Sequence, residues 1–176
     1  MKKVMISGVS GYIGSRIAAA MDQREAVAEI VGIDIRPPRV QSEKLKFFSL
    51  DVRAPLVDLM RAHHVDTVIH AAYVLPPIHD TALMEAINVT GTRNVLEAAA
   101  ETGVEHLLYT SSTTAYGFHP DNETPLIEES PLRGNDDFTY AKNKKRDRGP
   151  DAGLHGQPPS NDSDHPASLL CGGPRL

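Results

Sequence analysis

The chain has 176 residues, a length that allows one domain of about 150 residues and little more. Hydrophobic residues make up 40% of it and charged residues 23%, which excludes collagen-like, fully disordered and disulfide-stapled classes. The 23 Asp and Glu residues outnumber the 18 Lys and Arg residues, and no basic stripe is present, so we expect no nucleic-acid partner. The single cysteine, Cys171, offers neither an internal disulfide nor a metal-ligand spacing, and we expect no metal site.

The N-terminal segment does not have the pattern of a targeting sequence. Lys2 and Lys3 precede only the short apolar run Val4-Met5-Ile6, and no run of about 18 apolar residues exists in the chain. We therefore expect a cytoplasmic protein with no membrane partner.

Short β-branched runs alternate with helical patterns over the first 145 residues, which predicts a parallel sheet built from βαβ units. The expected strands are Lys3–Ser7, Ile30–Asp34, Lys46–Leu50, Thr67–His70 and His106–Ser111. The expected helices are Gly11–Gln23, Leu56–His63 and Leu83–Thr102, the last one capped by Gly103. The fold class is therefore α/β, a doubly wound sheet of about five strands with its ligand crevice beyond their carboxyl ends.

A glycine-rich loop, Gly8-Val9-Ser10-Gly11-Tyr12-Ile13-Gly14, joins the first strand to the first helix. Its first glycine permits a tight turn, its second lets a pyrophosphate approach the backbone, and its third lets the helix and strand pack closely. The helix N-terminus then offers free N–H groups to the phosphates. The motif predicts a Rossmann-like dinucleotide site, whereas an ordinary tight strand-to-helix turn is the alternative.

Asp34 ends the second expected strand, 20 residues beyond Gly14, where a carboxylate would accept hydrogen bonds from the adenosine ribose hydroxyls. The negative charge favours NAD over NADP, because a 2′-phosphate would meet a like charge. Arg36, two residues on, keeps NADP open.

Tyr140 and Lys144 are four residues apart in a stretch that should be helical, so they share one face. The hydroxyl-rich segment Thr110–Gly117 follows the fifth expected strand, on the ligand side of the sheet. Together with the glycine loop, the serine-rich strand end finishing in Tyr-Gly and the YxxxK motif resemble the extended short-chain dehydrogenase/reductase family, the NAD-dependent epimerase/dehydratase group. The resemblance covers about residues 3–145.

The resemblance implies that Ser112, Tyr140 and Lys144 are the catalytic residues. Ser112 would orient a substrate hydroxyl or carbonyl, Tyr140 would act as acid or base, and Lys144 would assist Tyr140 and hydrogen-bond the nicotinamide ribose. A lysine ammonium favours the phenolate form of a neighbouring tyrosine, which otherwise ionises near pH 10. Ser111 is the alternative to Ser112, because a slip of one residue along a strand changes the face presented.

The cofactor-binding set implied by the resemblance spans the whole crevice. Asp51 and Val52 would contact the adenine and Ala71-Ala72 would line the adenosine half, although a polar strand end and small packing residues are the alternative. The set comprises Gly8, Ser10, Gly11, Tyr12, Ile13, Gly14, Asp34, Ile35, Arg36, Asp51, Val52, His70, Ala71, Ala72, Asn88, Tyr140 and Lys144.

The composition changes after Lys144. Residues 145–176 hold 10 of the 26 Gly and Pro residues and contain no Phe, Tyr, Trp, Ile, Val or Met. Such a segment buries too little apolar surface to offset its ordering entropy, so we expect a domain over residues 1–145 and a disordered, low-complexity tail over 146–176. The family resemblance stops at the same point, where codons for Arg146–Gly149 read with a one-base shift can encode the helical continuation Glu-Ile-Glu-Ala. A frameshift is our hypothesis, with a natural low-complexity tail as the alternative.

Two functions of different class follow. The first is an NAD(P)-dependent oxidoreductase, epimerase or dehydratase acting on a nucleotide sugar or a similar hydroxyl or carbonyl substrate, for which the resemblance implies a homodimer in the full-length form. The second is a truncated, non-catalytic NAD-binding fragment.

Overall fold

The computed structural model describes residues 1–75 and 80–148. The expected tail therefore lies outside the described residues, apart from Arg146–Arg148, which continue the last helix past the expected boundary.

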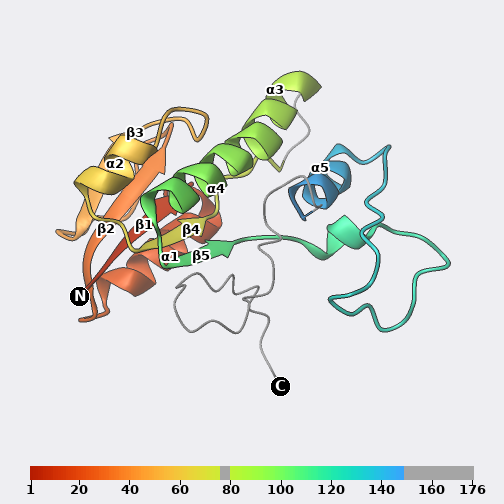
Figure 1. Cartoon of the computed structure of the whole chain (residues 1–176), viewed down its shortest axis with the longest axis horizontal. Coiled ribbons are helices and arrows are strands. Elements are labelled where there is room, and N and C mark those ends of the chain that lie inside the picture. The colour runs from red at the N-terminus through yellow and green to blue at the C-terminus, as the bar shows by residue number, and fades with distance from the viewer. Residues whose placement is uncertain (76–79, 149–176) are drawn as a thin grey trace.

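A parallel five-stranded sheet forms the centre of the described chain, in the order β3-β2-β1-β4-β5 (Figure 1). Its strands are β1 (Lys2–Ser7), β2 (Val27–Asp34), β3 (Leu45–Ser49), β4 (Thr67–His70) and β5 (His106–Tyr109). The strand order reverses direction at β1, so β1 and β4 flank the switch point at which doubly wound sheets bind ligands. The α/β, Rossmann-like fold class is confirmed.

Helices cover both faces of the sheet, because the buried strands present apolar residues on both sides. On one face, helix α1 (Tyr12–Asp22) packs through Ile17, Ala18 and Met21 on Ile6 and Ile30. On the other face lie α2 (Val57–Ala62) and α4 (Gly91–Thr102), whose Met60 and Val95 pack in a second cluster.

One long helical rod runs along that second face and contains three segments. The α-helix α3 (Thr81–Glu85) passes into a π-helical turn, η1 (Ala86–Thr90), and then into α4. The expected cap Gly103 ends α4 with φ +71°. The sequence pattern predicted the helix but not the π turn within it.

The described chain after β5 lies to one side of the sheet (Figure 1). A 3₁₀ turn, η2 (Thr113–Tyr116), is followed by a long irregular segment and by α5 (Thr139–Arg148). Helix α5 packs against η2 and η1, which brings it to the carboxyl ends of the strands.

Candidate functional site

The glycine loop is held together by backbone contacts too close for side chains. A Cβ at Gly14 would lie 2.1 Å from the Gly8 carbonyl oxygen, and a Cβ at Gly8, where φ is +73°, would lie 2.6 Å from the Ala72 nitrogen. A Cβ at Gly11 would meet only the Gly8 oxygen, at 3.2 Å. The first and third glycines therefore serve packing, and Gly11 stays open toward the crevice.

Gly11 is the N-cap residue of helix α1, and no side chain caps the helix there. The first backbone N–H groups of a helix have no partner within it, and they carry the positive end of the helix dipole. Tyr12 and Ile13 in this first turn are exposed. An anion placed beside Gly11 would find unused donors there.

Asp34 links the end of β2 to the glycine loop. Its Oδ2 accepts a hydrogen bond from the Ser10 backbone nitrogen at 3.1 Å, and its Oδ1 accepts from the Arg36 nitrogen at 3.0 Å. The Arg36 carbonyl in turn accepts a hydrogen bond of 2.6 Å from the Ser10 hydroxyl. The Arg36 guanidinium lies 3.9 Å from the carboxylate and is largely exposed. These contacts fix the acidic group at the mouth of the crevice.

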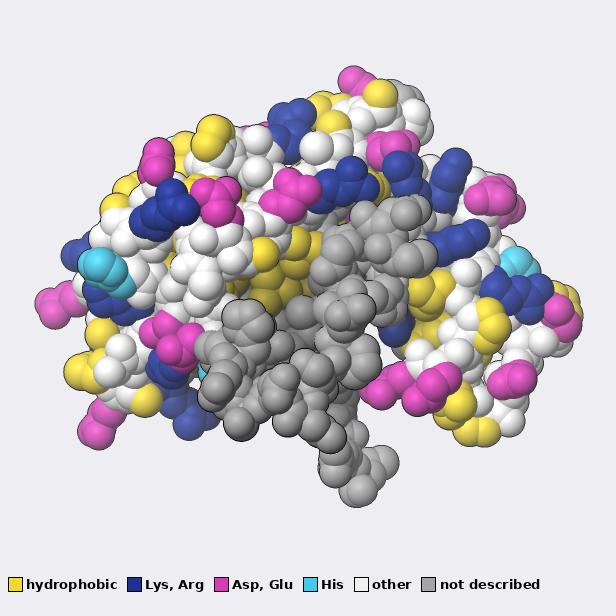
Figure 2. Space-filling view, in the orientation of Figure 1, with side chains coloured by type: hydrophobic (Ala, Val, Ile, Leu, Met, Phe, Trp, Pro, Cys, Tyr) yellow, Lys and Arg dark blue, Asp and Glu magenta, His cyan; other side chains and the backbone are white. Residues whose placement is uncertain are grey.

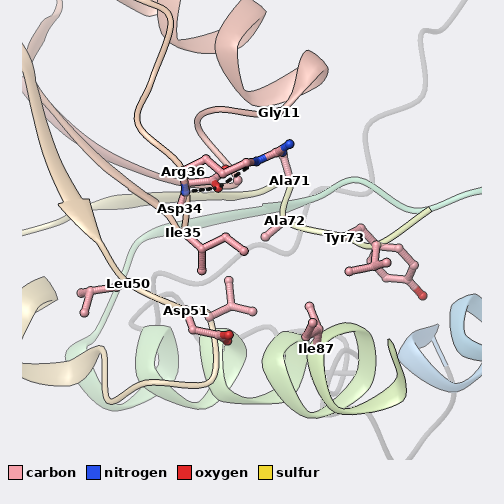
Figure 3. Close-up of a pocket in the computed structure, with 13 residues that line it drawn as sticks. Gly11, Asp34, Ile35, Arg36, Leu50, Asp51, Ala71, Ala72, Tyr73 and Ile87 are labelled. Carbon is pink, nitrogen blue, oxygen red and sulfur yellow. Dashed lines mark hydrogen bonds and ion pairs between the residues drawn. The ribbon is translucent and has the colours of Figure 1, made fainter. Parts of the chain in front are cut away.

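A pocket of about 360 Å³ opens at the carboxyl ends of β1 to β4 (Figure 3). Asp34 and Asp51 lie near one end of it, and Tyr73 lies at the end closest to α5 (Figure 3). Its volume falls in the range of small-molecule sites. The lining residues are Gly8, Gly11, Asp34, Ile35, Arg36, Leu50, Asp51, Val52, Ala71, Ala72, Tyr73, Val74 and Ile87.

Asp51 is paired within its own turn. Both of its carboxylate oxygens accept hydrogen bonds from the Arg53 side chain, at 2.9 and 2.7 Å. This ion pair and its hydrogen bonds lower the pKa of Asp51. The pocket therefore carries two carboxylates, Asp34 and Asp51, both held by local partners.

Asn88 acts from beneath the pocket. It is fully buried in the π turn, and its amide forms two hydrogen bonds with the Val74 backbone, accepting from the nitrogen at 2.8 Å and donating to the oxygen at 3.1 Å. Because Val74 lines the pocket, Asn88 shapes the wall but does not line it. Wide π turns of this kind are frequent at functional sites.

His70 is also buried beneath the pocket and does not line it. The Thr92 hydroxyl donates its proton to the Asn88 carbonyl at 2.5 Å, so at 2.9 Å it accepts from His70 Nε2–H. The Ser7 hydroxyl then donates to Nδ1 at 2.5 Å, which fixes a neutral tautomer. Burial, aided by the Lys144 charge, lowers the pKa of His70 to about 3.

Lys144 has nearly no exposed surface. Its Nζ donates to the Tyr109 hydroxyl at 2.7 Å and to the Thr110 carbonyl at 2.8 Å, and it lies 3.5 Å from the centre of the Tyr73 ring. Burial lowers the pKa of Lys144 to about 7. The resemblance predicts that Lys144 binds the cofactor ribose. In the structure, two of the three ammonium N–H groups instead donate hydrogen bonds to Tyr109 on β5 and to the carbonyl of Thr110.

The structure brings Tyr140 close to Lys144 but shows no contact between either residue and Ser112. Lys144 Nζ lies 5.9 Å from the Tyr140 ring centre, and Tyr140 packs edge-on against Tyr73. The Ser112 hydroxyl accepts hydrogen bonds from the Thr114 nitrogen and hydroxyl, at 3.2 and 2.9 Å, and so begins η2. Ser112 and Tyr140 are both partly exposed, as reacting groups must be.

Asp147 is a buried carboxylate that the sequence analysis did not include in the site. Its Oδ2 accepts hydrogen bonds from the hydroxyls of Tyr109 at 2.6 Å and Tyr73 at 3.0 Å. Within the described residues, its Oδ1 and the Asn143 side-chain nitrogen are buried without a hydrogen-bond partner. Burial raises the pKa of Asp147.

The pocket and this buried cluster share Tyr73, which lines the one and contacts Lys144 in the other. Nine of the expected cofactor residues line the pocket: Gly8, Gly11, Asp34, Ile35, Arg36, Asp51, Val52, Ala71 and Ala72. Ser10 contacts it through Asp34, while Tyr12, Ile13, Gly14, His70, Asn88, Tyr140 and Lys144 are not among its lining residues. The sequence analysis did not include four further lining residues: Leu50, Tyr73, Val74 and Ile87. The only sequence signal for them is their position after an expected strand or on the face of an expected helix.

A glycine loop entering an uncapped helix, an acidic residue at the end of β2 and a crevice at the strand-order switch define a dinucleotide-binding α/β domain. Residues 4–145 match the model of the NAD dependent epimerase/dehydratase family, and the chain belongs to this family.

Relatives with different reactions match the same part of the chain. The 3 beta-hydroxysteroid dehydrogenase type 7 of Mus musculus is 30% identical over 149 residues, which cover 77% of this chain and 38% of the relative. The UDP-glucose 4-epimerase of Klebsiella pneumoniae is 30% identical over 147 residues, which cover 72% of this chain and 99% of the relative.

A solved structure supports the fold. The Bordetella bronchiseptica enzyme WbmH in complex with NAD+ is 27% identical, with a TM-score of 0.74 over 83% of this chain and 50% of that one. The chain thus spans half the length of this structure and 38% of the mouse relative.

Over the described residues, no helix is both long and apolar enough to cross a bilayer. The same part of the chain holds no group of three His, Cys, Asp or Glu side chains able to bind a metal ion.

Proposed function

We propose that this chain is the NAD-binding and catalytic part of an enzyme that moves a hydride between the nicotinamide and a hydroxyl or carbonyl carbon of a nucleotide sugar or a similar small molecule. The observation that carries the proposal is the continuity of the site. The pocket runs from Asp34 to Tyr73, and Tyr73 contacts both Tyr140 and Lys144. Binding residues and reactive residues thus adjoin one another.

The residues present fit a dinucleotide. The pyrophosphate would lie at the uncapped N-terminus of α1 beside Gly11, and the adenosine half would lie between the Asp34 and Asp51 sides of the pocket. Asp34 would accept hydrogen bonds from ribose hydroxyls and repel a 2′-phosphate, which favours NAD over NADP. The NAD-bound state of WbmH supports this choice.

The reaction needs a group that moves a proton while the nicotinamide, once bound, supplies or accepts the hydride. Tyr140 would move the proton of the substrate hydroxyl, and Lys144, with Nζ 5.9 Å from the Tyr140 ring centre, would be the cationic group beside it. Ser112 would hold the substrate oxygen by a hydrogen bond. The UDP-glucose 4-epimerase relative supports a sugar nucleotide as the substrate class, and the steroid dehydrogenase relative supports a wider hydroxyl class.

Cofactor preference is tested by calorimetric titration with NAD and NADP. Wild-type protein should bind NAD more tightly, and Asp34→Asn should reduce this preference about fivefold, because removing one charge near 4 Å in a water-like medium changes the energy by about 1 kcal/mol. Asn keeps one oxygen that can accept from the Ser10 nitrogen, while the hydrogen bond from the Arg36 nitrogen is lost. A preference unchanged by Asp34→Asn would contradict the role of this carboxylate.

Catalysis is tested by rapid mixing of the NAD-loaded protein with UDP-glucose while the reduced-nicotinamide absorbance is followed. Tyr140→Phe should slow the absorbance change about a hundredfold or more, as expected when a general acid–base group is lost. Tyr116→Phe, a buried tyrosine in η2, is the matched control. Equal rates in Tyr140→Phe and wild-type protein would show that Tyr140 does not move the proton.

A non-catalytic NAD-binding fragment is the second candidate. It is favoured by Lys144, whose protons are engaged by Tyr109 and Thr110 and whose ammonium is covered by the Tyr73 ring. NAD binding without any absorbance change on mixing with UDP-glucose or a hydroxysteroid would support this candidate.

A further inference from the structure

Three aromatic side chains surround the Lys144 ammonium. Its Nζ lies 3.5 Å from the ring centre of Tyr73, 4.4 Å from that of Tyr109 and 5.9 Å from that of Tyr140. Aromatic faces attract a cation, and the attraction is larger where water is excluded. Of the three phenols, only that of Tyr109 is hydrogen-bonded to Nζ.

The Tyr109 hydroxyl bridges a cation to an anion. Its oxygen accepts from Lys144 Nζ at 2.7 Å, and its proton goes to Asp147 Oδ2 at 2.6 Å. A hydroxyl that donates to a carboxylate becomes a better acceptor, so each of these hydrogen bonds strengthens the other. The ring is stacked on His70, with centroids 5.6 Å apart and planes 19° from parallel. His70 is itself fixed by Ser7 and Thr92, so the hydroxyl has a rigid support.

We propose that Tyr109 is the positioning residue for Lys144, and that its hydroxyl transmits the stabilising effect of the buried Asp147 carboxylate to the lysine ammonium. In this arrangement the ammonium is held in a buried place, 5.9 Å from the centre of the Tyr140 ring. The inference rests on the proposed function in one respect only: that the Lys144 ammonium takes part in catalysis. The arrangement itself is a property of the folded chain.

Other titratable and charged groups face this cluster from each neighbouring element, and the test must separate them from Tyr109. They are His70 on β4, Tyr73 after β4, and Tyr140, Arg146 and Asp147 on α5. His70 is neutral near pH 7, since its pKa lies near 3. Tyr73 is the closest rival, because its hydroxyl donates to the same oxygen of Asp147 but forms no hydrogen bond with Lys144.

The experiment follows the side-chain nitrogen signal of Lys144 by NMR in full-length protein labelled with ¹⁵N-lysine, with Lys144→Met to assign the signal. In wild-type protein the signal should titrate near pH 7. Tyr109→Phe should lower that midpoint by about one pH unit or more, because the ammonium loses an acceptor and Asp147 loses a donor. Tyr73→Phe removes only a donor to Asp147 and should lower the midpoint by less than half as much.

Equal shifts in Tyr109→Phe and Tyr73→Phe, or no shift in Tyr109→Phe, would overturn the inference. Circular dichroism and thermal unfolding establish that each variant is folded.

Titration of the same samples with NAD and AMP adds a second measurement. Tyr109→Phe should weaken NAD binding and leave AMP binding unchanged, because AMP occupies only the adenosine half. Wild-type protein that fails to bind NAD would contradict the proposed function, and the NMR titration would still decide the role of Tyr109.

Discussion

A single methyl group at Gly14 would lie 2.1 Å from the Gly8 carbonyl oxygen, well inside the contact distance of nonbonded atoms. The atom it meets belongs to the backbone of a tight turn, so no side chain can rotate away to make room. At Gly11 the corresponding distance is 3.2 Å, and only one atom is met. Within one motif, Gly14 is therefore required for close packing of the turn, whereas Gly11 leaves space beside the pocket.

Gly14→Ala should therefore destabilise the protein by about 1–3 kcal/mol, the range for overpacked sites. Gly11→Ala should change stability by less than about 1 kcal/mol and weaken NAD binding instead, since Gly11 lines the pocket. Urea unfolding measures the first effect and calorimetry the second. Should both variants lose stability equally, the division of roles between the two glycines would be wrong.

His70 joins three elements by hydrogen bonds: β4, which carries it, β1 through Ser7 and α4 through Thr92. Because burial lowers its pKa from 6.5 to about 3, the unfolded chain binds a proton between these values that the folded chain excludes. Stability from this group is complete above pH 6.5 and is lost as the pH falls toward 3.

The free energy of unfolding should therefore fall by up to about 1.4 kcal/mol per pH unit below pH 6.5. Urea unfolding at several pH values measures this slope. His70→Gln should flatten the slope, while the exposed His64→Gln variant keeps it, because His70 is still present. A slope that His70→Gln leaves as steep as in wild-type protein would assign it to other groups.

At the scale of elements, periodicity was enough to predict all five strands, because β-branched runs bounded by turn residues mark buried parallel strands. The end of β5 was not predicted correctly. The expected strand runs to Ser111, but pairing stops at Tyr109 because its partner strand β4 ends at His70. A strand's length depends on its neighbour, which a single sequence does not show.

The pocket lining was predictable where a local motif carries it, as at Gly8, Gly11 and Asp34. The cluster around Lys144 was not, since Tyr73 follows β4, Tyr109 ends β5 and Asp147 lies on α5. Their meeting depends on how α5 packs beside β5, and no spacing in the sequence encodes that.

At the scale of the whole molecule, β5 is one of the two edge strands of the sheet in the described chain, and β3 is the other. An edge strand offers unpaired backbone groups to other chains. Its Leu108 is 42% exposed, while the neighbouring Leu107 packs against the core on the other face. On the face seen in Figure 2, acidic and basic side chains are interspersed over the sheet and its helices, whereas Lys and Arg side chains gather over α5.

Leu108→Lys should therefore reduce concentration-dependent association, measured by light scattering, with little change in the free energy of unfolding. Leu107→Lys should destabilise the fold, since it places a charge against the core. Association that Leu108→Lys does not reduce would mean that chains meet through another surface.

A π turn holds one more residue in each hydrogen-bonded ring than an α turn does. Across Ala86–Thr90 the long helix therefore carries the equivalent of a one-residue insertion, which shifts the angular phase of everything before it by about 100°. Deleting one residue there would leave a regular α-helix, yet Thr81–Glu85 would turn about the axis. Met84 would leave its buried position, and Asn88 would turn away from Val74. The pocket wall thus depends on a count of residues in this turn as much as on their identity.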